Sequence, residues 1–458
     1  MSFECHHLDK WVFANLDLCE EQLELGKHKA LVLISGASSS GKSFAAQYLA
    51  EILKNSQHKL ITISLDMYNF GLSGIIPNKV NKNYFDGKLP KMEEIRNIIK
   101  DIIYDIPFEK KYDRTSLNKI KKALNQYMSG SDLTKFIKGL SEEWAKLNFD
   151  EPSVYDLEEA AKDIHLLFEN KTIKEKKYSK IVSERIDSKH RIDGSDCDII
   201  VVEGIYSLTN EFLNLLEDLN PIKNFIDGNP KSLFLRRILR DKVSTSAPST
   251  FTIKNYFKFI IPSYEETILP ARNHADIILN NEMTFLELRE GPLYSIRDTF
   301  EVTNNEGLKY LKEHSHIIYE HYEKDSYFGV LNEISRGDNI LRFREISKDK
   351  GLTYEPFSLI HKGINKLRKD GRIIRAVNVL LDEKEVKEVW QTEDSCLLDF
   401  SRAGFIIKKI EKKVKTRIIY KNQSFTLFEV EGKKAYIEIH NPCEEKILVE
   451  IKKLLTSE

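Results

Sequence analysis

A glycine-rich stretch near the N-terminus constrains this chain more than any other feature. Apolar residues 31–34 predict a buried strand, Gly36-x4-Gly41-Lys42-Ser43 follows it, and residues 44–53 have helical apolar spacing. Strand, glycine loop and helix form the context of a phosphate-binding loop, where successive backbone N–H groups point at one anion. The loop therefore predicts nucleotide binding by Gly36, Ala37, Ser38, Ser39, Ser40, Gly41, Lys42 and Ser43.

Two side chains of this loop have specific expected roles. Lys42 is expected to reach the β- and γ-phosphates, and the Ser43 hydroxyl to ligate Mg²⁺. The sequence therefore predicts ATP and Mg²⁺ as cofactors. The alternative is a Gly/Ser turn between an ordinary strand and an ordinary helix.

Length and composition limit the class of protein. With 458 residues the chain is too long for one ordinary domain, and its formal net charge of −1 disfavours a general nucleic-acid binder. No apolar stretch reaches the length of a membrane span, the N-terminus lacks a signal-peptide pattern, and the five cysteines have no paired spacing. We therefore expect a cytoplasmic protein without membrane or nucleic-acid partners. The oligomeric state stays open, and a homo-oligomer is one of the alternatives.

Hydrophobic patterning divides the chain into three expected parts. Residues 1–26 predict an N-terminal helical segment, 27–288 an α/β domain with a parallel sheet flanked by helices, and 292–458 an α+β domain of antiparallel strands. Within the α/β domain, residues 70–147 are polar and Lys-rich and predict a helical insertion. Its helices are expected at 92–104, 116–128 and 133–147.

Two acidic residues follow buried strands of the α/β domain. Asp66 comes after the strand expected at 59–65, and Glu203 ends the strand expected at 198–203. Because ligands of open α/β sheets gather at the carboxyl ends of strands, both acids should face the phosphate loop. Asp66 is expected to accept the proton of an attacking hydroxyl, and Ser43, Asp66 and Glu203 to form the metal site. The alternative is that each acid caps a nearby loop.

Three arginines lie near one end of the helix expected at 232–242. Arg236, Arg237 and Arg240 are spaced so that they could clamp a phosphoryl group and exclude water. A solvated basic face is the alternative. The predicted catalytic residues are therefore Asp66, Lys42, Arg237 and Arg240.

Alternating strands of the C-terminal part place cations on shared faces. Arg342 and Arg344 share one face, as do Lys415 and Arg417 on a later strand, and Lys362 and Arg375 end or begin neighbouring strands. If these faces close into a barrel, its interior is cationic and suits a polyphosphate chain. The alternative is an ordinary sheet with one solvated face.

The ordered motifs of residues 27–285 resemble the uridine kinase family of P-loop kinases. The resemblance implies Asp66 as general base, the arginine-rich helix as a lid, and substrate binding by Asp150, Tyr178, Arg185 and Arg236. The family's Tyr-Asp-Phe and later His are replaced here by Tyr178-Ser179-Lys180 and Ser183. The matching motifs are Gly36–Ser43, Ser64–Tyr68, Asn148–Asp156, Tyr178–Arg185, Val202–Ile205 and Arg236–Asp241.

The C-terminal motifs resemble the CYTH family, whose members form an antiparallel β-barrel tunnel. The matching stretches are Phe300–Val302, Asp325–Phe328, Leu341–Arg344, Lys415–Arg417 and Tyr436–Ile439, although only Glu301 remains of the family's Glu-x-Glu-x-Lys. The resemblance implies phosphate binding in the tunnel. The expected tunnel residues are Glu301, Arg342, Arg344, Lys362, Arg375, Lys415, Arg417 and Glu438.

Three functions stay open on these observations. The first is an ATP/Mg²⁺-dependent phosphotransferase that phosphorylates a nucleoside-like hydroxyl acceptor, with a second domain that binds a phosphorylated or polyphosphate ligand. The second is a tunnel-type pyrophosphatase or triphosphatase. The third is a nucleotide-binding regulatory protein without turnover.

Overall fold

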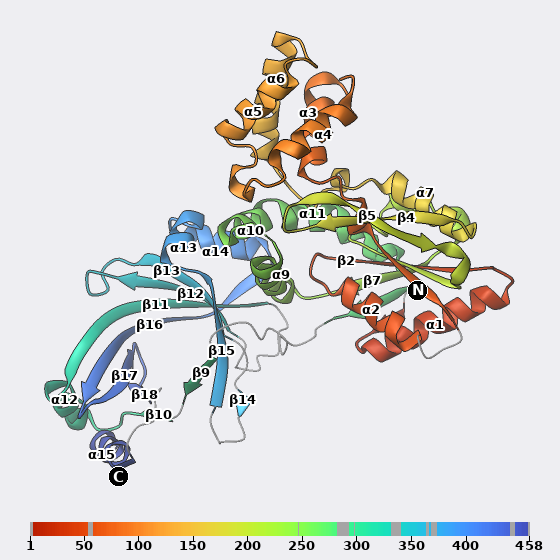
Figure 1. Ribbon diagram of the computed structural model, residues 1–458. Coiled ribbons are helices and arrows are strands. Elements are labelled where there is room, and N and C mark those ends of the chain that lie inside the picture. The colour runs from red at the N-terminus through yellow and green to blue at the C-terminus, as the bar shows by residue number, and fades with distance from the viewer. Residues whose placement is uncertain are drawn as a thin grey trace. The chain divides into compact units, whose positions relative to one another are not determined.

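The computed structural model describes residues 3–53, 58–245, 247–281, 293–296, 298–330, 340–362, 366–367, 373–439 and 445–456. The chain groups into two compact units (Figure 1). The first comprises Met1–Asn229 and Arg240–Glu282, and the second comprises Pro230–Leu239 and Met283–Glu458. The boundary therefore falls twice around helix α9 (Pro230–Ser244), whose first part belongs to the second unit.

A six-stranded parallel sheet forms the centre of the first unit, in the order β1-β8-β7-β2-β6-β3. The central strand β2 is buried along its whole length, as expected for a parallel sheet covered on both faces. The predicted parallel α/β architecture is confirmed. The strands are β1 (Phe3–Cys5), β2 (Ala30–Gly36), β3 (Leu60–Ser64), β6 (Ile199–Glu203), β7 (Ile222–Asp227) and β8 (Ile277–Asn280).

Helices cover both faces of this sheet (Figure 1). Val32 and Ile34 of β2 join a core with α1 (Leu8–Glu24) and α2 (Lys42–Leu53). Leu31 and Leu33 point the other way, into a core with α7 (Leu157–Phe168). Alternate residues of one strand thus feed two cores, which is the reason its sequence is a continuous apolar run.

The N-terminal segment contains more than the predicted helix. Phe3–Cys5 forms the edge strand β1, which pairs in parallel with Ile277–Leu279 of β8. The Trp11 Nε1 of α1 donates to Asn224 Oδ1 over 2.8 Å, so the segment is part of the first unit. Three residues are too few for a strand periodicity to be visible, and their partner lies far along the chain.

Residues 70–147 contain four α-helices that share a core of their own. The helices expected at 116–128 and 133–147 begin earlier, because the side chains of Asp113 and Ser129 cap them by accepting from Ser116 N and Asp132 N. A fourth helix precedes the three that were predicted. The insertion helices are α3 (Leu72–Phe85), α4 (Met92–Ile103), α5 (Arg114–Leu124) and α6 (Gly130–Trp144).

A two-stranded hairpin and several short helices complete the first unit. The hairpin consists of β4 (Thr172–Ser179) and β5 (Glu184–Asp193), and the sequence pattern did not predict it. The remaining α-helices are α8 (Asn210–Asn214), α10 (Ser249–Asn255) and α11 (Ile261–Ser263). Within the described ranges, no helix combines the length and apolar character needed to cross a lipid bilayer.

The second unit is built on an antiparallel sheet. Its strand order is β10-β18-β17-β16-β11-β12-β13-β15-β14, and β9 also pairs with β15. No pairing between described strands joins β10 to β9 or β14, so a closed tunnel stays a prediction. The strands are β9 (Leu293–Ile296), β10 (Asp298–Glu301), β11 (His316–Val330), β12 (Ile340–Ser347), β13 (Glu355–Lys362), β14 (Lys366–Leu367), β15 (Ile373–Leu381), β16 (Phe405–Tyr420), β17 (Gln423–Val430) and β18 (Tyr436–Ile439).

Helices pack against this sheet in two places. Leu311 of helix 305–313 and Ile451 of helix 445–455 lie in a core with Phe425 of β17. Phe400 of helix 393–402 stacks on Phe328 of β11. Sequence patterns did not predict the helices at 383–389 and 393–402 or the long strand β11. In β11, charged residues interrupt the apolar alternation that is typical of a strand. The last strand of the sheet, β18, ends at Ile439. The helices are α12 (Asn305–Glu313), α13 (Glu383–Val389), α14 (Glu393–Arg402) and α15 (Glu445–Leu455).

Candidate active site

The phosphate loop between β2 and α2 has the backbone that the sequence predicts. Gly36, Ser39 and Gly41 all have positive φ, at 143°, 66° and 101°. A Cβ on Gly36 would lie 2.3 Å from the carbonyl oxygen of Ile226, so only glycine fits there. The loop therefore curls over the carboxyl end of the sheet, where its N–H groups can surround an anion.

Lys42 is buried at the start of α2. Its Nζ donates to Gly36 O at 3.0 Å and to Ala37 O at 2.7 Å. Burial lowers the pKa of Lys42 to about 8. The negative charges of Glu203 and Asp66 raise this pKa and so offset part of the effect of burial. The lysine thus lies beside the loop and interacts electrostatically with both predicted acids.

The two predicted acids lie at neighbouring strand ends. Glu203 is level with Ile34 of β2 and Ser64 of β3. Burial, and then the charge of Asp66, raise the pKa of Glu203, although hydrogen bonds from Ser64 and Ser43 oppose the shift. The carboxylate of Glu203 is therefore in contact with Ser43, the predicted metal-binding hydroxyl.

Asp66 follows β3 in a short 3-10 helix, Leu65–Tyr68. Its Oδ2 lies 2.9 Å from the Nζ of Lys180, and its Oδ1 accepts a hydrogen bond from the Tyr155 hydroxyl at 3.3 Å. Burial raises the pKa of Asp66, but Lys180, Lys42 and Arg240 outweigh it and hold the pKa below its ordinary value. Asp66 is therefore ionised at neutral pH, as a proton acceptor must be.

The predicted acceptor residues occupy different positions. Asp150 is buried, and its charge raises the pKa of Lys42, Tyr155 and Tyr206. Tyr178 lies directly opposite Arg185 in the β4–β5 hairpin. Asp66 and Asp150 therefore belong to one group of charges around Lys42.

The predicted lid arginines divide between the two units. Arg240 belongs to the first unit, binds Asp241 with its Nη2 at 2.7 Å, and lowers the pKa of both Lys42 and Asp66. Arg236 and Arg237 belong to the part of α9 that groups with the second unit. Their contact with a phosphoryl group stays a prediction.

Sequence reasoning missed Asn281, Tyr155 and Lys180. Asn281 follows β8, and its Nδ2 donates to Ser40 O over 2.6 Å, within the phosphate loop. Its position after the last parallel strand could have indicated this role, because ligand-binding residues collect there. Tyr155 and Lys180 lie within motifs that match the family, and Lys180 departs from its pattern, but only the fold brings both side chains to Asp66.

The residues present fit a nucleotide and Mg²⁺. The hydroxyl oxygens of Ser39 and Ser40 are buried, and neither has a hydrogen-bond partner among the described residues. Buried hydroxyls of this kind need a partner, and phosphate oxygens would supply it. Ser43, Asp66 and Glu203 provide the oxygen ligands that Mg²⁺ prefers.

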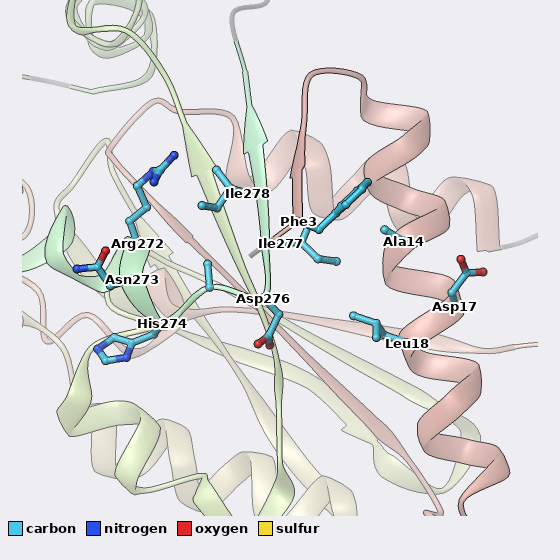
Figure 2. A pocket seen from close by; sticks show the side chains of 11 residues that line it. Phe3, Ala14, Asp17, Leu18, Arg272, Asn273, His274, Asp276, Ile277 and Ile278 are labelled. Carbon is cyan, nitrogen blue, oxygen red and sulfur yellow. The ribbon is translucent and has the colours of Figure 1, made fainter. Parts of the chain in front are cut away.

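A cavity of about 710 Å³ lies elsewhere in the first unit (Figure 2). It opens at the β1–β8 edge of the sheet, between α1 and the 3-10 helix Pro270–His274, and β7 separates that edge from β2. Arg272 in its wall is already paired with Glu4 and Asp227. The cavity is therefore separate from the phosphate loop.

In the second unit, the cationic face carries acids that the sequence analysis did not place there. Arg344 binds Asp325 through Nε at 2.7 Å and Glu323 through Nη1 at 2.7 Å, and Lys413 Nζ lies 2.6 Å from Asp325. Burial raises the pKa of Asp325, but Arg342, Arg344 and Lys413 hold it well below the usual range. The predicted set of tunnel residues did not include Glu323 and Asp325, because β11, which carries both acids, was not predicted as a strand.

The other predicted tunnel residues are spread over the same sheet. Lys415 Nζ lies 4.0 Å from Glu323, and Arg417 Nη1 donates to Thr426 Oγ1 at 2.9 Å. Glu438 is level with Thr426 and with Thr299. Three residues remain: Lys362 ends β13, Glu301 is exposed and 3.7 Å from Lys434, and the side chain of Arg375 lies outside the described residues.

The parallel sheet, the phosphate loop after β2 and the acids at neighbouring strand ends define the first unit as a P-loop kinase domain. Residues 115–285 match the model of the phosphoribulokinase / uridine kinase family. The chain is 31% identical over 157 residues to the uridine kinase of Ureaplasma parvum, which covers 34% of this chain and 70% of that protein.

Two further proteins are similar to parts of this chain. Uridine-cytidine kinase A of Dictyostelium discoideum is 28% identical over 209 residues, covering 45% of this chain and 41% of that protein. The structure titled "Possible Uridine Kinase" from Bacillus stearothermophilus is 14% identical, covering 57% of this chain and 95% of that chain, with a TM-score of 0.30.

The chain belongs to the uridine kinase family. It spans 41% of the length of the Dictyostelium relative and 64% of the uridine kinase of Staphylococcus epidermidis. The resemblance of the second unit to the CYTH family stays a prediction.

Proposed function

We propose that the first unit transfers the γ-phosphate of ATP to a hydroxyl group of a nucleoside-like acceptor. One observation supports this most: Lys42, Asp66 and Glu203 gather at the phosphate loop closely enough for each acid to shift the pKa of Lys42. Phosphoryl transfer needs this combination of a phosphate cradle, a cation and an oriented base.

Asp66 takes the proton of the acceptor hydroxyl, whose oxygen then forms the new bond to the γ-phosphorus while ADP leaves. Lys42 and Arg240 neutralise the charge that develops on the phosphoryl oxygens. Ser43, Asp66 and Glu203 would hold Mg²⁺, which supplies further charge neutralisation when bound.

The test is Asp66→Asn, assayed by release of ADP from MgATP with uridine and other hydroxyl acceptors. We expect the turnover rate to fall at least a hundredfold, because a positioned base contributes about 10²–10⁴. Asp86→Asn is the matched control, since Asp86 is exposed and has the left-handed conformation that asparagine also adopts. Full activity of Asp66→Asn would contradict the assignment of the base.

For the second unit we propose binding of a phosphorylated or polyphosphate ligand on the face that carries Arg342 and Arg344. Four cations, Arg342, Arg344, Lys413 and Lys415, surround two acids, Glu323 and Asp325. The excess of positive charge favours an anion, and arginine matches phosphate geometry.

The probe is tripolyphosphate, titrated into the whole chain by calorimetry. Lys415→Ala should weaken binding about tenfold, because Lys415 is partly exposed and lies at the edge of the ion cluster. Lys309→Ala is the control, since Lys309 is exposed and its Nζ lies 3.9 Å from Glu313 of the same helix, α12. No heat, or unchanged affinity of Lys415→Ala, would contradict the proposal. Release of phosphate from tripolyphosphate without an acceptor would instead favour the triphosphatase alternative.

A further inference from the structure

The β4–β5 hairpin carries a lysine into the predicted acceptor site. Ser179 and Glu184 are the last paired residues, so Lys180 lies in the turn between the strands. At this position the family pattern has an aromatic residue. Lys180 is therefore a departure at the acceptor site.

The start of β5, next to the turn, is attached to the chain segment that follows Asp66. Arg185 donates to Tyr68 O at 2.9 Å and to Asn69 O at 3.1 Å, and it binds Glu159 at 3.0 Å. All three contacts are within the protein, so Arg185 is already engaged where the family resemblance would have it hold a nucleoside.

The two residues before Arg185 are attached to helix α3. The buried carboxylate of Glu184 accepts from Ser73 N at 2.9 Å and from Ser73 Oγ at 2.6 Å. Leu72 N donates to Ser183 O at 2.9 Å. The turn is thus fixed at its β5 end by contacts of Ser183, Glu184 and Arg185.

Lys180 Nζ lies 2.9 Å from Asp66 Oδ2, and both side chains are about half exposed, at 42% and 43%. Asp66 is the one side-chain partner of Lys180 among the described residues. An ammonium group has three N–H donors, and this contact uses one of them. The pair is therefore accessible to solvent, and Lys180 has N–H donors left for a ligand.

We propose that Lys180 is a specificity-determining residue and that the acceptor carries an anionic group, phosphate or carboxylate, near the hydroxyl that is phosphorylated. This rests on the proposed function, because it takes Asp66 as the base. A hydroxyl that reaches Asp66 brings its neighbouring groups beside Lys180. A neutral neighbour would leave the ammonium poorly solvated, whereas an anion forms a charge-assisted hydrogen bond with it.

The reaction keeps the balance of the parent proposal. The acceptor O–H loses its proton to Asp66, the acceptor oxygen bonds to the γ-phosphorus, and the bond from that phosphorus to the β-phosphate oxygen breaks. The products are the phosphorylated anionic acceptor, ADP and a proton. Lys180 forms and breaks no covalent bond. When its ammonium group binds the anionic group of the acceptor, its ion pair with Asp66 opens and the Asp66 carboxylate can accept the proton of the hydroxyl.

The experiment compares matched acceptors with and without an anionic group. Uridine 3′-phosphate against uridine tests a phosphate, and glycerate against glycerol tests a carboxylate, each with MgATP and the full chain. We expect kcat/KM to be at least tenfold higher for the anionic member of one pair. Lys180→Met should reduce that ratio at least tenfold, mainly through KM, and Lys180→Arg should retain part of it.

Lys177→Met is the control, because Lys177 lies on the same hairpin, is half exposed, and contacts Glu175 instead of Asp66. Its ratio should equal that of the wild type. Equal kcat/KM for neutral and anionic acceptors would overturn the role of Lys180, and so would an unchanged anionic-to-neutral ratio in Lys180→Met. The proposed function would still hold in either case if transfer depends on Asp66.

If no acceptor is phosphorylated, the proposed function is contradicted. The role of Lys180 is then tested by measuring the affinity for each acceptor. Calorimetry with protein loaded with Mg²⁺ and a non-hydrolysable ATP analogue measures the affinity of each matched pair. Tighter binding of the anionic member that is lost in Lys180→Met supports the inference. Equal affinities, or no binding, overturn it.

Discussion

The side-chain amide of Asn281 donates a hydrogen bond to the carbonyl oxygen of Ser40 over 2.6 Å, which ties the end of the last parallel strand to the phosphate loop. Both residues are buried, and the Asn281 backbone N–H is itself bonded to Asp227 O at 2.9 Å. Asn281 is therefore a positioning residue for the loop.

Asn281→Ala should weaken ATP binding about tenfold, because it leaves a buried carbonyl unsatisfied at a cost of about 1–3 kcal/mol. Calorimetric titration with MgATP measures the effect. Asn280→Ala changes the neighbouring residue, which is partly exposed, and should bind as the wild type does. Equal affinities of the two variants would show that the Asn281 contact does not shape the loop.

ATP binding should become weaker as the pH rises above about 8. Burial lowers the pKa of Lys42 to about 8, so in the free protein the ammonium loses its proton above that pH. Phosphate favours the protonated form, so binding above pH 8 takes up a proton and affinity falls by up to tenfold per pH unit. Titrations between pH 7 and about 10 measure the slope. Lys42→Arg keeps its charge and should lack this dependence, so the same slope in that variant would exclude Lys42 as the cause.

Gly36→Ala should abolish ATP binding and destabilise the first unit. The added Cβ would lie 2.3 Å from a backbone oxygen of Ile226, which cannot move without disturbing β7. Gly130→Ala is the matched control, because a Cβ at Gly130 meets nothing within 4 Å. Thermal unfolding and ATP titration of both variants give the comparison. Normal binding by Gly36→Ala would mean that the loop can rearrange.

Asp325→Asn should lower the free energy of unfolding by about 3–5 kcal/mol, since it leaves the charges of Arg344 and Lys413 buried without their partner. Glu301→Gln, at an exposed pair with Lys434, should change it by no more than about 0.5 kcal/mol. Urea denaturation followed by circular dichroism measures both. A wild-type midpoint for Asp325→Asn would show that water already solvates the cluster.

Much of the architecture was accessible from local patterns. The strand, loop and helix around Gly36–Ser43 are contiguous, and so are the apolar spacings of the insertion helices. Where boundaries differed, as at α5 and α6, capping side chains moved the start of the helix. Strand β11 escaped detection because its acids pair with cations on β12 and β16, so burial there does not depend on apolar residues.

The sequence by itself determined the phosphate loop and the placement of Asp66 and Glu203 after strands, because these features depend on residues adjacent in the chain. The tertiary structure alone decided that Lys180 lies against Asp66, that Asn281 holds Ser40, and that Asp325 lies among cations. Each of these contacts joins segments far apart in the chain, and the energy of a buried ion pair or amide depends on which strand neighbours which. Local periodicity carries no information about that neighbourhood.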